Sequence, residues 1–116
     1  MKIGSISENQ NIEKRIAITP EIVKKYISLG LEVSLIENYG YHLGIKDQQY
    51  KDIGVKISKD ESEILNTSDI IVQLGMLSDD NTSKIKENQT LIGVLNPYNN
   101  KEKLEKLAKK NINLFS

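Results

Sequence analysis

The sequence predicts an open, doubly wound α/β fold with a mostly parallel sheet, of the flavodoxin-like or Rossmann-like type. Two observations predict it. Six short apolar segments with the composition of strands alternate along the chain with segments whose apolar residues recur at helical spacing. The strand segments of the second half are apolar on both faces, which is typical of parallel strands covered by helices on both sides. The 116 residues correspond to one domain.

The first 37 residues predict a β-α-β unit. A strand over 2–6 leads through a polar loop to a helix that begins at Pro20, where the missing N–H of proline is tolerated, with Thr19 as its N-cap. Gly30 ends the helix in a left-handed conformation, and a second strand covers 31–37. The residues predicted to face inward from this helix are Ile22, Val23, Tyr26, Ile27 and Leu29.

The rest of the chain continues the alternation. A glycine-rich connector over 38–45 leads to a short helix capped by Asp47 and ended by Gly54. Further strands are predicted over 55–57, 68–74, 90–95 and 112–116, and further helices over 59–65, 78–87 and 101–110, the last with Leu104, Leu107 and Ala108 facing inward. Because the chain stops within an apolar strand signal, we expect residues 1–116 to be the N-terminal α/β domain of a longer polypeptide.

Composition excludes several classes of function. Sixteen acidic residues balance sixteen basic ones, which argues against a nucleic-acid partner, since such binding needs a basic surface. There is no cysteine, so disulfides and thiolate metal sites are absent, and His42 is the only histidine, so the chain offers no ligand set for a transition metal. No apolar run reaches the roughly 20 residues that span a bilayer, so we expect no direct membrane insertion.

The candidate site lies where strands end, because ligands of open α/β sheets bind beyond the carboxyl ends of the strands. Three loops qualify: the one after the first strand, "QLGMLSDD" after the fourth, and "NPYNN" after the fifth. The candidates to line a cleft there are Arg15, Gln73, Gly75, Asn96, Pro97 and Tyr98. No glycine-rich dinucleotide fingerprint follows any strand, so this segment is not expected to hold a pyrophosphate itself.

Arg15 is the only arginine of the chain, while the other fifteen basic residues are lysines. A guanidinium is planar and always charged, and it can grip a carboxylate or a phosphate at two points, which a lysine cannot do. The alternative is a local salt bridge to Glu8 or Glu13. We predict that Arg15 lines the cleft at the carboxyl end of the sheet.

These segments resemble a known family. "KRIAITPEIVKKYISLGLEV" (14–33) is similar to the N-terminal signature of the alanine dehydrogenase and transhydrogenase family, which runs R-V-A-x-T-P, a helix and G-x-x-V. "YGYHLGIKDQQYKDIGVKI" (39–57) resembles the family's next segment, with Tyr41 in place of the usual alanine. Residues 68–112 follow the family's next block without an obvious gap, so the resemblance covers essentially the whole chain.

The resemblance also separates two branches of the family. Alanine dehydrogenases bind the substrate carboxylate with an arginine, which matches Arg15, and a lysine, whose position falls on Gly75; their histidine falls on Asn96. "NPYNNKEKLEKLAKKNI", with Pro97, is instead similar to the alpha subunit of proton-translocating NAD(P) transhydrogenase, the branch we favour. Gln73 replaces a lysine usual in both branches.

By this resemblance, the full subunit binds NAD(H) in a cleft between two domains, and the dinucleotide fingerprint lies downstream of Ser116. Hydride passes to NADP(H) on a partner subunit and is coupled to proton translocation. The implied partners are a beta subunit, a membrane component and a second alpha subunit in a homodimer, on the cytoplasmic side of the inner membrane.

On this hypothesis the 116 residues form a wall of the cleft and, alone, are inactive and bind no cofactor. Two alternatives stay open: an amino-acid dehydrogenase domain of alanine or saccharopine type, and a non-catalytic α/β binding module.

Overall fold

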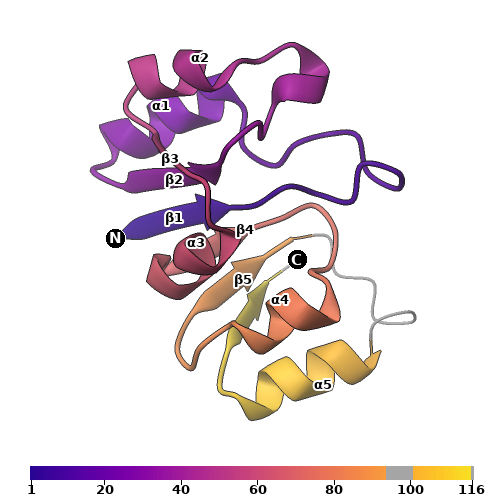
Figure 1. The fold of residues 1–116 in the computed structure, drawn as a ribbon. Helices are drawn as coiled ribbons and strands as arrows, with labels where there is room; N and C mark the ends of the chain where they lie inside the picture. Colours follow the sequence, from indigo (N-terminus) through magenta and orange to yellow (C-terminus); the bar gives the residue numbers. More distant parts are fainter. Residues whose placement is uncertain (94–100, 116) are drawn as a thin grey trace.

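The structure is a computed structural model that describes residues 1–93 and 101–115. Strands and helices alternate along the chain (Figure 1). The strands are β1 (Lys2–Ser5), β2 (Glu32–Ile36), β3 (Lys56–Ser58), β4 (Ile70–Val72), β5 (Thr90–Ile92) and β6 (Asn113–Phe115). The helices are α1 (Pro20–Ser28), the short 3-10 helix η1 (Tyr41–Leu43), α2 (Asp47–Asp52), α3 (Glu61–Thr67), α4 (Asp79–Ser83) and α5 (Lys101–Lys109).

The six strands form one sheet in the order β3-β2-β1-β4-β5-β6, and every recorded pair is parallel. The predicted doubly wound α/β class is therefore confirmed. Of the two arrangements that the sequence left open, this is the Rossmann order and not the flavodoxin order. The order reverses between β1 and β4, so the carboxyl ends of these two strands form the switch point of the sheet.

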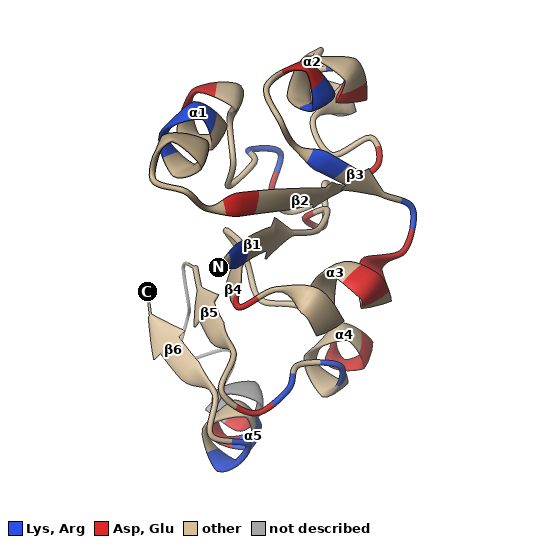
Figure 2. Ribbon diagram, turned by 90° about the vertical axis from the view of Figure 1, so that its left-hand side faces the viewer, with Lys and Arg blue, Asp and Glu red and all other residues tan. Residues whose placement is uncertain are grey.

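Helices cover the two faces of the sheet unequally (Figures 1 and 2). α1 packs against β2 and α2 against β3 on one side, while α3 lies on the other side against β1, β2 and β3. α4 and α5 contact each other on the same side as α3. Each strand is therefore joined to the next strand along the chain by a crossover, and the loops at the carboxyl ends of β1 and β4 meet at one edge of the molecule.

The first helix forms as predicted, because its start and stop signals are local. Thr19 Oγ1 accepts a hydrogen bond from the Ile22 N–H at 3.4 Å, and Gly30 has a φ of 84°. Val23 is fully buried. Leu29, however, is 75% exposed, because the helix ends at Ser28 and the next residue leaves the inward-facing stripe.

Other predictions need correction. Asp47 is the first residue of α2 and not its cap, and its carboxylate accepts the Asn38 N–H at 2.9 and 3.0 Å. In α5, Leu107 is fully buried but Ala108 is exposed, because it lies about 100° further around the helix. The predicted inward position of Leu104 lies outside the side chains that the structure describes.

The fourth helix is shorter than the predicted range of 78–87, since α4 ends at Ser83. The Gln89 side chain explains the difference. Its Oε1 accepts the Lys86 N–H, and its Nε2 donates to the carbonyls of Leu65 and Ser68 at 2.6 and 2.7 Å. This buried amide ties the segment before β5 to the end of α3, so the helix cannot continue.

The core follows the strands. The largest fully buried apolar side chains come from both faces of the sheet and include Ile18, Val23, Leu35, Ile64, Leu65, Ile71 and Leu107, together with the rings of Tyr39 and Tyr50. Within the part of the chain that the structure describes, no helix has the length and apolar character to cross a bilayer.

Candidate functional site

A cavity of about 680 Å³ lies at the switch point of the sheet, beyond the carboxyl ends of β1 and β4. Its walls are residues 6–9 after β1, residues 73 and 75–78 after β4, and side chains from the loop before α1 and from α3 and α4. This is where doubly wound sheets bind their ligands, because the loops diverge there and leave a crevice. The cavity is therefore the candidate site.

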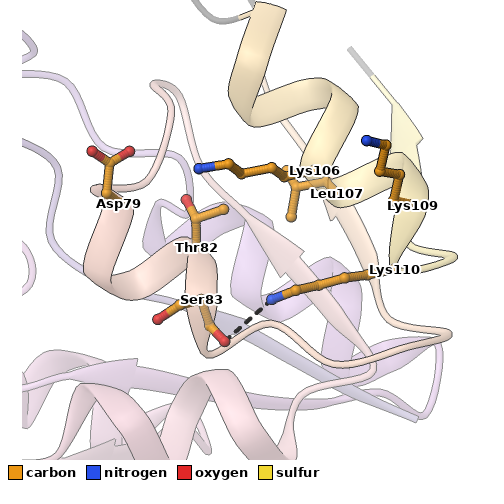
Figure 3. A pocket seen from close by; sticks show the side chains of 7 residues that line it. All are labelled: Asp79, Thr82, Ser83, Lys106, Leu107, Lys109 and Lys110. Atoms are coloured by element: carbon orange, nitrogen blue, oxygen red, sulfur yellow. Dashed lines mark hydrogen bonds between the residues drawn. The ribbon is translucent and has the colours of Figure 1, made fainter.

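A second, smaller hollow of about 250 Å³ lies between α4 and α5 (Figure 3). Leu107 forms part of its floor, and Lys106, Lys109 and Lys110 surround it. The Lys110 Nζ donates to the Ser83 carbonyl at 3.3 Å and so ties the two helices together. This hollow lies away from the strand ends, and we do not count it as the candidate site.

Gln73 joins the two strands that border the cavity. Its Oε1 accepts the Ile6 N–H at 2.7 Å, and its Nε2 donates to the Ile6 carbonyl at 3.0 Å. The side-chain amide thus pairs with Ile6 as a peptide group of a neighbouring strand would, beyond the last recorded β1–β4 pair, Gly4 with Ile71. Gln73 is only 2% exposed, so this pairing fixes the spacing of the strands where the cavity begins.

Glu8 ties the loop after β1 to the residues after β4. Its carboxylate accepts the N–H groups of Leu74 at 2.7 Å and Gly75 at 3.0 Å, and the Gln73 Nε2 donates to it at 3.1 Å. Partial burial raises the pKa of Glu8, and these hydrogen bonds oppose that shift. The negative charge of Glu13 raises the pKa of Glu8 further.

Arg15 forms a local ion pair. Its Nη2 donates to Glu13 Oε1 at 2.6 Å and its Nε to Glu13 Oε2 at 3.1 Å, in a two-point contact. This contact lowers the pKa of Glu13. The Arg15 side chain is 76% exposed, and among the described residues it is Glu13, not Arg15, that lines the cavity. Arg15 therefore stands beside the cavity, and its place in a cleft stays a prediction.

A buried chain of hydrogen bonds runs from Gln73 to the start of α1. Tyr39 Oη accepts the N–H groups of Ala17 and Ile18, both at 3.2 Å, so its own proton goes to Ser5 Oγ at 2.9 Å. Ser5 Oγ in turn contacts the Val72 carbonyl and, at 2.9 Å, Gln73 Oε1. Burial raises the pKa of Tyr39, which keeps the hydroxyl protonated as this chain requires.

The cavity is acidic. Glu8, Glu13 and Glu61 contribute to its lining, whereas no lysine, arginine or histidine does so among the described residues. Carboxylates in a partly buried site repel an anionic ligand more strongly than they would in water. Over residues 1–93 and 101–115, no group of three or more histidine, aspartate and glutamate side chains could hold a metal ion.

The predicted site residues have different outcomes. Gln73 and Gly75 both line the cavity, while Asn96, Pro97 and Tyr98 lie outside the described residues. Reasoning from the sequence considered Glu8 only as a partner for Arg15 and did not single out Tyr39. One signal could have found both: each is polar and follows closely on a strand at the carboxyl end of the sheet.

Comparisons with known proteins agree with this geometry. The family model "Alanine dehydrogenase/PNT, N-terminal domain" matches residues 4–116. An NAD(P) transhydrogenase alpha-subunit chain of Rickettsia prowazekii is 35% identical over 120 residues, which cover 100% of this chain and 31% of that protein. The N(5)-(carboxyethyl)ornithine synthase of Clostridium botulinum is 34% identical over 97 residues, which cover 84% of this chain and 29% of that protein.

Among solved structures, the transhydrogenase from Sinorhizobium meliloti superimposes with a TM-score of 0.91 at 26% identity. The match covers 100% of this chain and 34% of that one. The chain thus spans about a third of the length of the relatives it matches.

Proposed function

Because the chain belongs to the alanine dehydrogenase/PNT N-terminal domain family, we propose that it forms the N-terminal domain of an NAD(P) transhydrogenase alpha subunit. The match along the whole chain to a transhydrogenase alpha subunit supports this choice within the family. In the full subunit, NAD(H) lies between this domain and a second domain that carries the dinucleotide fingerprint. Hydride passes between NAD(H) and NADP(H) on a partner subunit, coupled to proton translocation.

The role of this domain is to form one wall of the NAD(H) cleft. The position of the cavity at the switch point supports this role, since the cofactor of doubly wound folds lies beyond the strand ends there. Arg15, Gln73 and Gly75 contribute to the wall, and so do Asn96, Pro97 and Tyr98. The wall excludes water from the cofactor and orients it, while the second domain holds the pyrophosphate.

The proposal includes an assembly. The partners are a beta subunit that binds NADP(H), a membrane component, and a second alpha subunit in a homodimer. The complex lies on the cytoplasmic side of the inner membrane, and this domain stays peripheral to it. The Rickettsia prowazekii relative is named as a subunit, which supports a multi-subunit complex. Alone, the 116 residues bind NAD(H) weakly or not at all, and they have no activity.

The chemistry of the cavity favours this function over oxidation of a free amino acid. An alanine dehydrogenase needs cations to hold the substrate carboxylate, as the resemblance implies. Here the position of the expected lysine is Gly75, whose N–H holds the Glu8 carboxylate at 3.0 Å. The Arg15 guanidinium is already paired with Glu13 at 2.6 Å. An incoming carboxylate would meet carboxylates and no free cation among the described lining residues. This charge pattern counts against alanine as a substrate, and the match along the whole chain to a transhydrogenase alpha subunit is the observation that carries the choice of function.

One observation favours a second candidate. The Clostridium botulinum relative is named for an ornithine product, and the acidic lining of the cavity suits a cationic amine. A domain of an enzyme that joins an amino acid to a carboxyethyl group is therefore the alternative within the dehydrogenase class. It differs from the first candidate in needing an amine substrate.

The experiment uses the full-length product of the gene. One assay supplies NADPH and an oxidised NAD analogue with the NADP-binding partner present; a second supplies NAD and alanine; a third supplies NADPH, pyruvate and ornithine. We expect hydride transfer in the first assay alone. Turnover only with alanine would make the protein an alanine dehydrogenase in spite of Gly75 and Asn96, and turnover only with ornithine would establish the second candidate.

A further inference from the structure

The connector that follows β2 reaches back to the loop that carries Arg15. Both segments leave the sheet on the same side, at the carboxyl ends of β1 and β2 (Figure 1). Two side chains of the connector, Tyr39 and His42, make hydrogen bonds to the backbone on either side of Arg15. Neither residue lines the cavity described above.

His42 fixes the peptide group before Arg15. Its Nε2 lies 2.7 Å from the Lys14 carbonyl oxygen, which can only accept, so Nε2 carries the proton. Its Nδ1 lies 3.2 Å from the Gln10 Nε2 and accepts from it. One imidazole thus joins two points of the loop between β1 and α1. The histidine is exposed, so its loss would remove these contacts without opening a hole in the core.

Tyr39 fixes the peptide groups after Arg15. Its hydroxyl oxygen accepts two consecutive N–H groups, those of Ala17 and Ile18, each at 3.2 Å. The Tyr50 hydroxyl donates to the Ile18 carbonyl at 2.8 Å, and the two rings pack edge to face with centroids 6.1 Å apart. Ile18 is therefore held at both its N–H and its carbonyl by buried phenols. This is the fixed end of the Arg15 segment.

We infer that Tyr39 and His42 are positioning residues for Arg15, acting from opposite sides of its segment. A two-point contact such as Arg15 with Glu13 depends on the backbone between them, because a small rotation there separates one of the two donors from its acceptor. With Lys14 and Ile18 anchored, the guanidinium keeps one place beside the cavity. The inference deepens the proposed function and rests on it for one point, that Arg15 belongs to the cofactor cleft.

The test uses the single arginine of the chain, which gives one assignable Nε–H signal in a nitrogen-15 NMR spectrum. We would compare wild type, His42→Ala and Tyr39→Phe by the position of this signal and its rate of hydrogen exchange with water. In both variants we expect the signal to shift and its exchange to accelerate by about fivefold, the factor that corresponds to one lost hydrogen bond. His42→Gln should restore both readings, because a glutamine amide can still donate to the Lys14 carbonyl.

Tyr41→Phe is the matched control, since Tyr41 neighbours His42 and is 67% exposed. It should leave the arginine signal unchanged. An Arg15 signal identical to wild type in His42→Ala would overturn the inference, and so would a shift that His42→Gln fails to reverse. If Tyr39→Phe does not fold, the comparison of His42→Ala with His42→Gln still tests the inference. The NMR signal reports on Arg15 itself. A failure of the transhydrogenase assay would therefore not change the conclusion about Tyr39 and His42.

Discussion

At the level of single residues, Glu8 is a side chain that makes stability depend on pH. Its carboxylate sits in the acidic cavity, and burial, with Glu13 nearby, raises its pKa above the ordinary value. The folded chain therefore binds this proton more tightly than the unfolded chain does. The contribution of Glu8 to stability is fully present below its unfolded pKa and is lost as the pH rises through its higher folded pKa.

We predict that Glu8→Gln removes this loss of folding stability at higher pH. The difference in unfolding free energy between Glu8→Gln and wild type should shift in favour of the variant as the pH rises above the ordinary pKa of a glutamate, about 4.3, because the pKa of Glu8 is raised in the folded chain. Urea unfolding followed by circular dichroism at several pH values measures it. Lys2→Gln, on an exposed side chain at the other end of β1, should show no such trend. A difference that is constant with pH would mean that Glu8 titrates as it does in the unfolded chain.

The residues of the site could be predicted only in part, for a physical reason. Gln73 and Gly75 were accessible to sequence reasoning because they follow a strand, and strand ends mark the ligand side of the sheet. The contacts of Glu8 and Tyr39 were not, because their partners lie more than twenty residues away in the chain. Which polar side chain meets which backbone group is decided by the order of the strands in the sheet, which brings distant loops together, and no local pattern indicates it.

At the level of elements, β1 and α3 approach each other closely at Gly4. A Cβ atom added to Gly4 would lie 2.0 Å from Ser68 Oγ and 2.7 Å from Ile64 Cγ2. Neither neighbour can move freely, since both residues are buried and Ser68 Oγ donates to the Ile64 carbonyl at 2.7 Å. The helix can cover β1 only because this position has no side chain.

We therefore predict that Gly4→Ala destabilises the chain by about 1–3 kcal/mol, as overpacking of a core does. The midpoint of thermal or urea unfolding measures it. Gly75→Ala is the matched control, because its Cβ would meet only Glu8 Oε1 at 3.5 Å, an ordinary contact, and its effect should stay within about 0.5 kcal/mol. Equal losses in the two variants would show that the close approach at Gly4 is relaxed by a small shift of α3.

The elements themselves were largely predictable, and the early end of α4 is an exception with a tertiary cause. The bounds of α1 can be predicted from Thr19, Pro20 and Gly30, because each of these residues acts within one turn of the helix. The end of α4 could not be predicted in this way. The Gln89 side-chain amide that accepts the Lys86 N–H also donates to a carbonyl of α3, which lies much earlier in the sequence. A helix boundary set by a tertiary contact leaves no local signal.

At the level of the whole molecule, charge and topology set what the chain can bind. The net charge is zero, but the carboxylates of Glu8, Glu13 and Glu61 gather at the switch point. Dinucleotides are normally held at such a point by a glycine-rich turn whose N–H groups and helix dipole bind the pyrophosphate. Here the sequence has no such turn, and the N–H groups of Leu74 and Gly75, which follow β4, donate to Glu8 instead.

It follows that the 116 residues alone should bind NADH weakly, with a Kd above about 1 mM, because the phosphates meet carboxylates and no cationic side chain among the described lining residues. Titration of the purified chain with NADH, followed by cofactor fluorescence, measures this. The full-length product is the positive control, since on the proposed function its second domain holds the pyrophosphate. A Kd of about 10 μM or lower for the 116 residues would contradict the assignment of this domain as a wall, and would require a phosphate site that the acidic cavity does not provide.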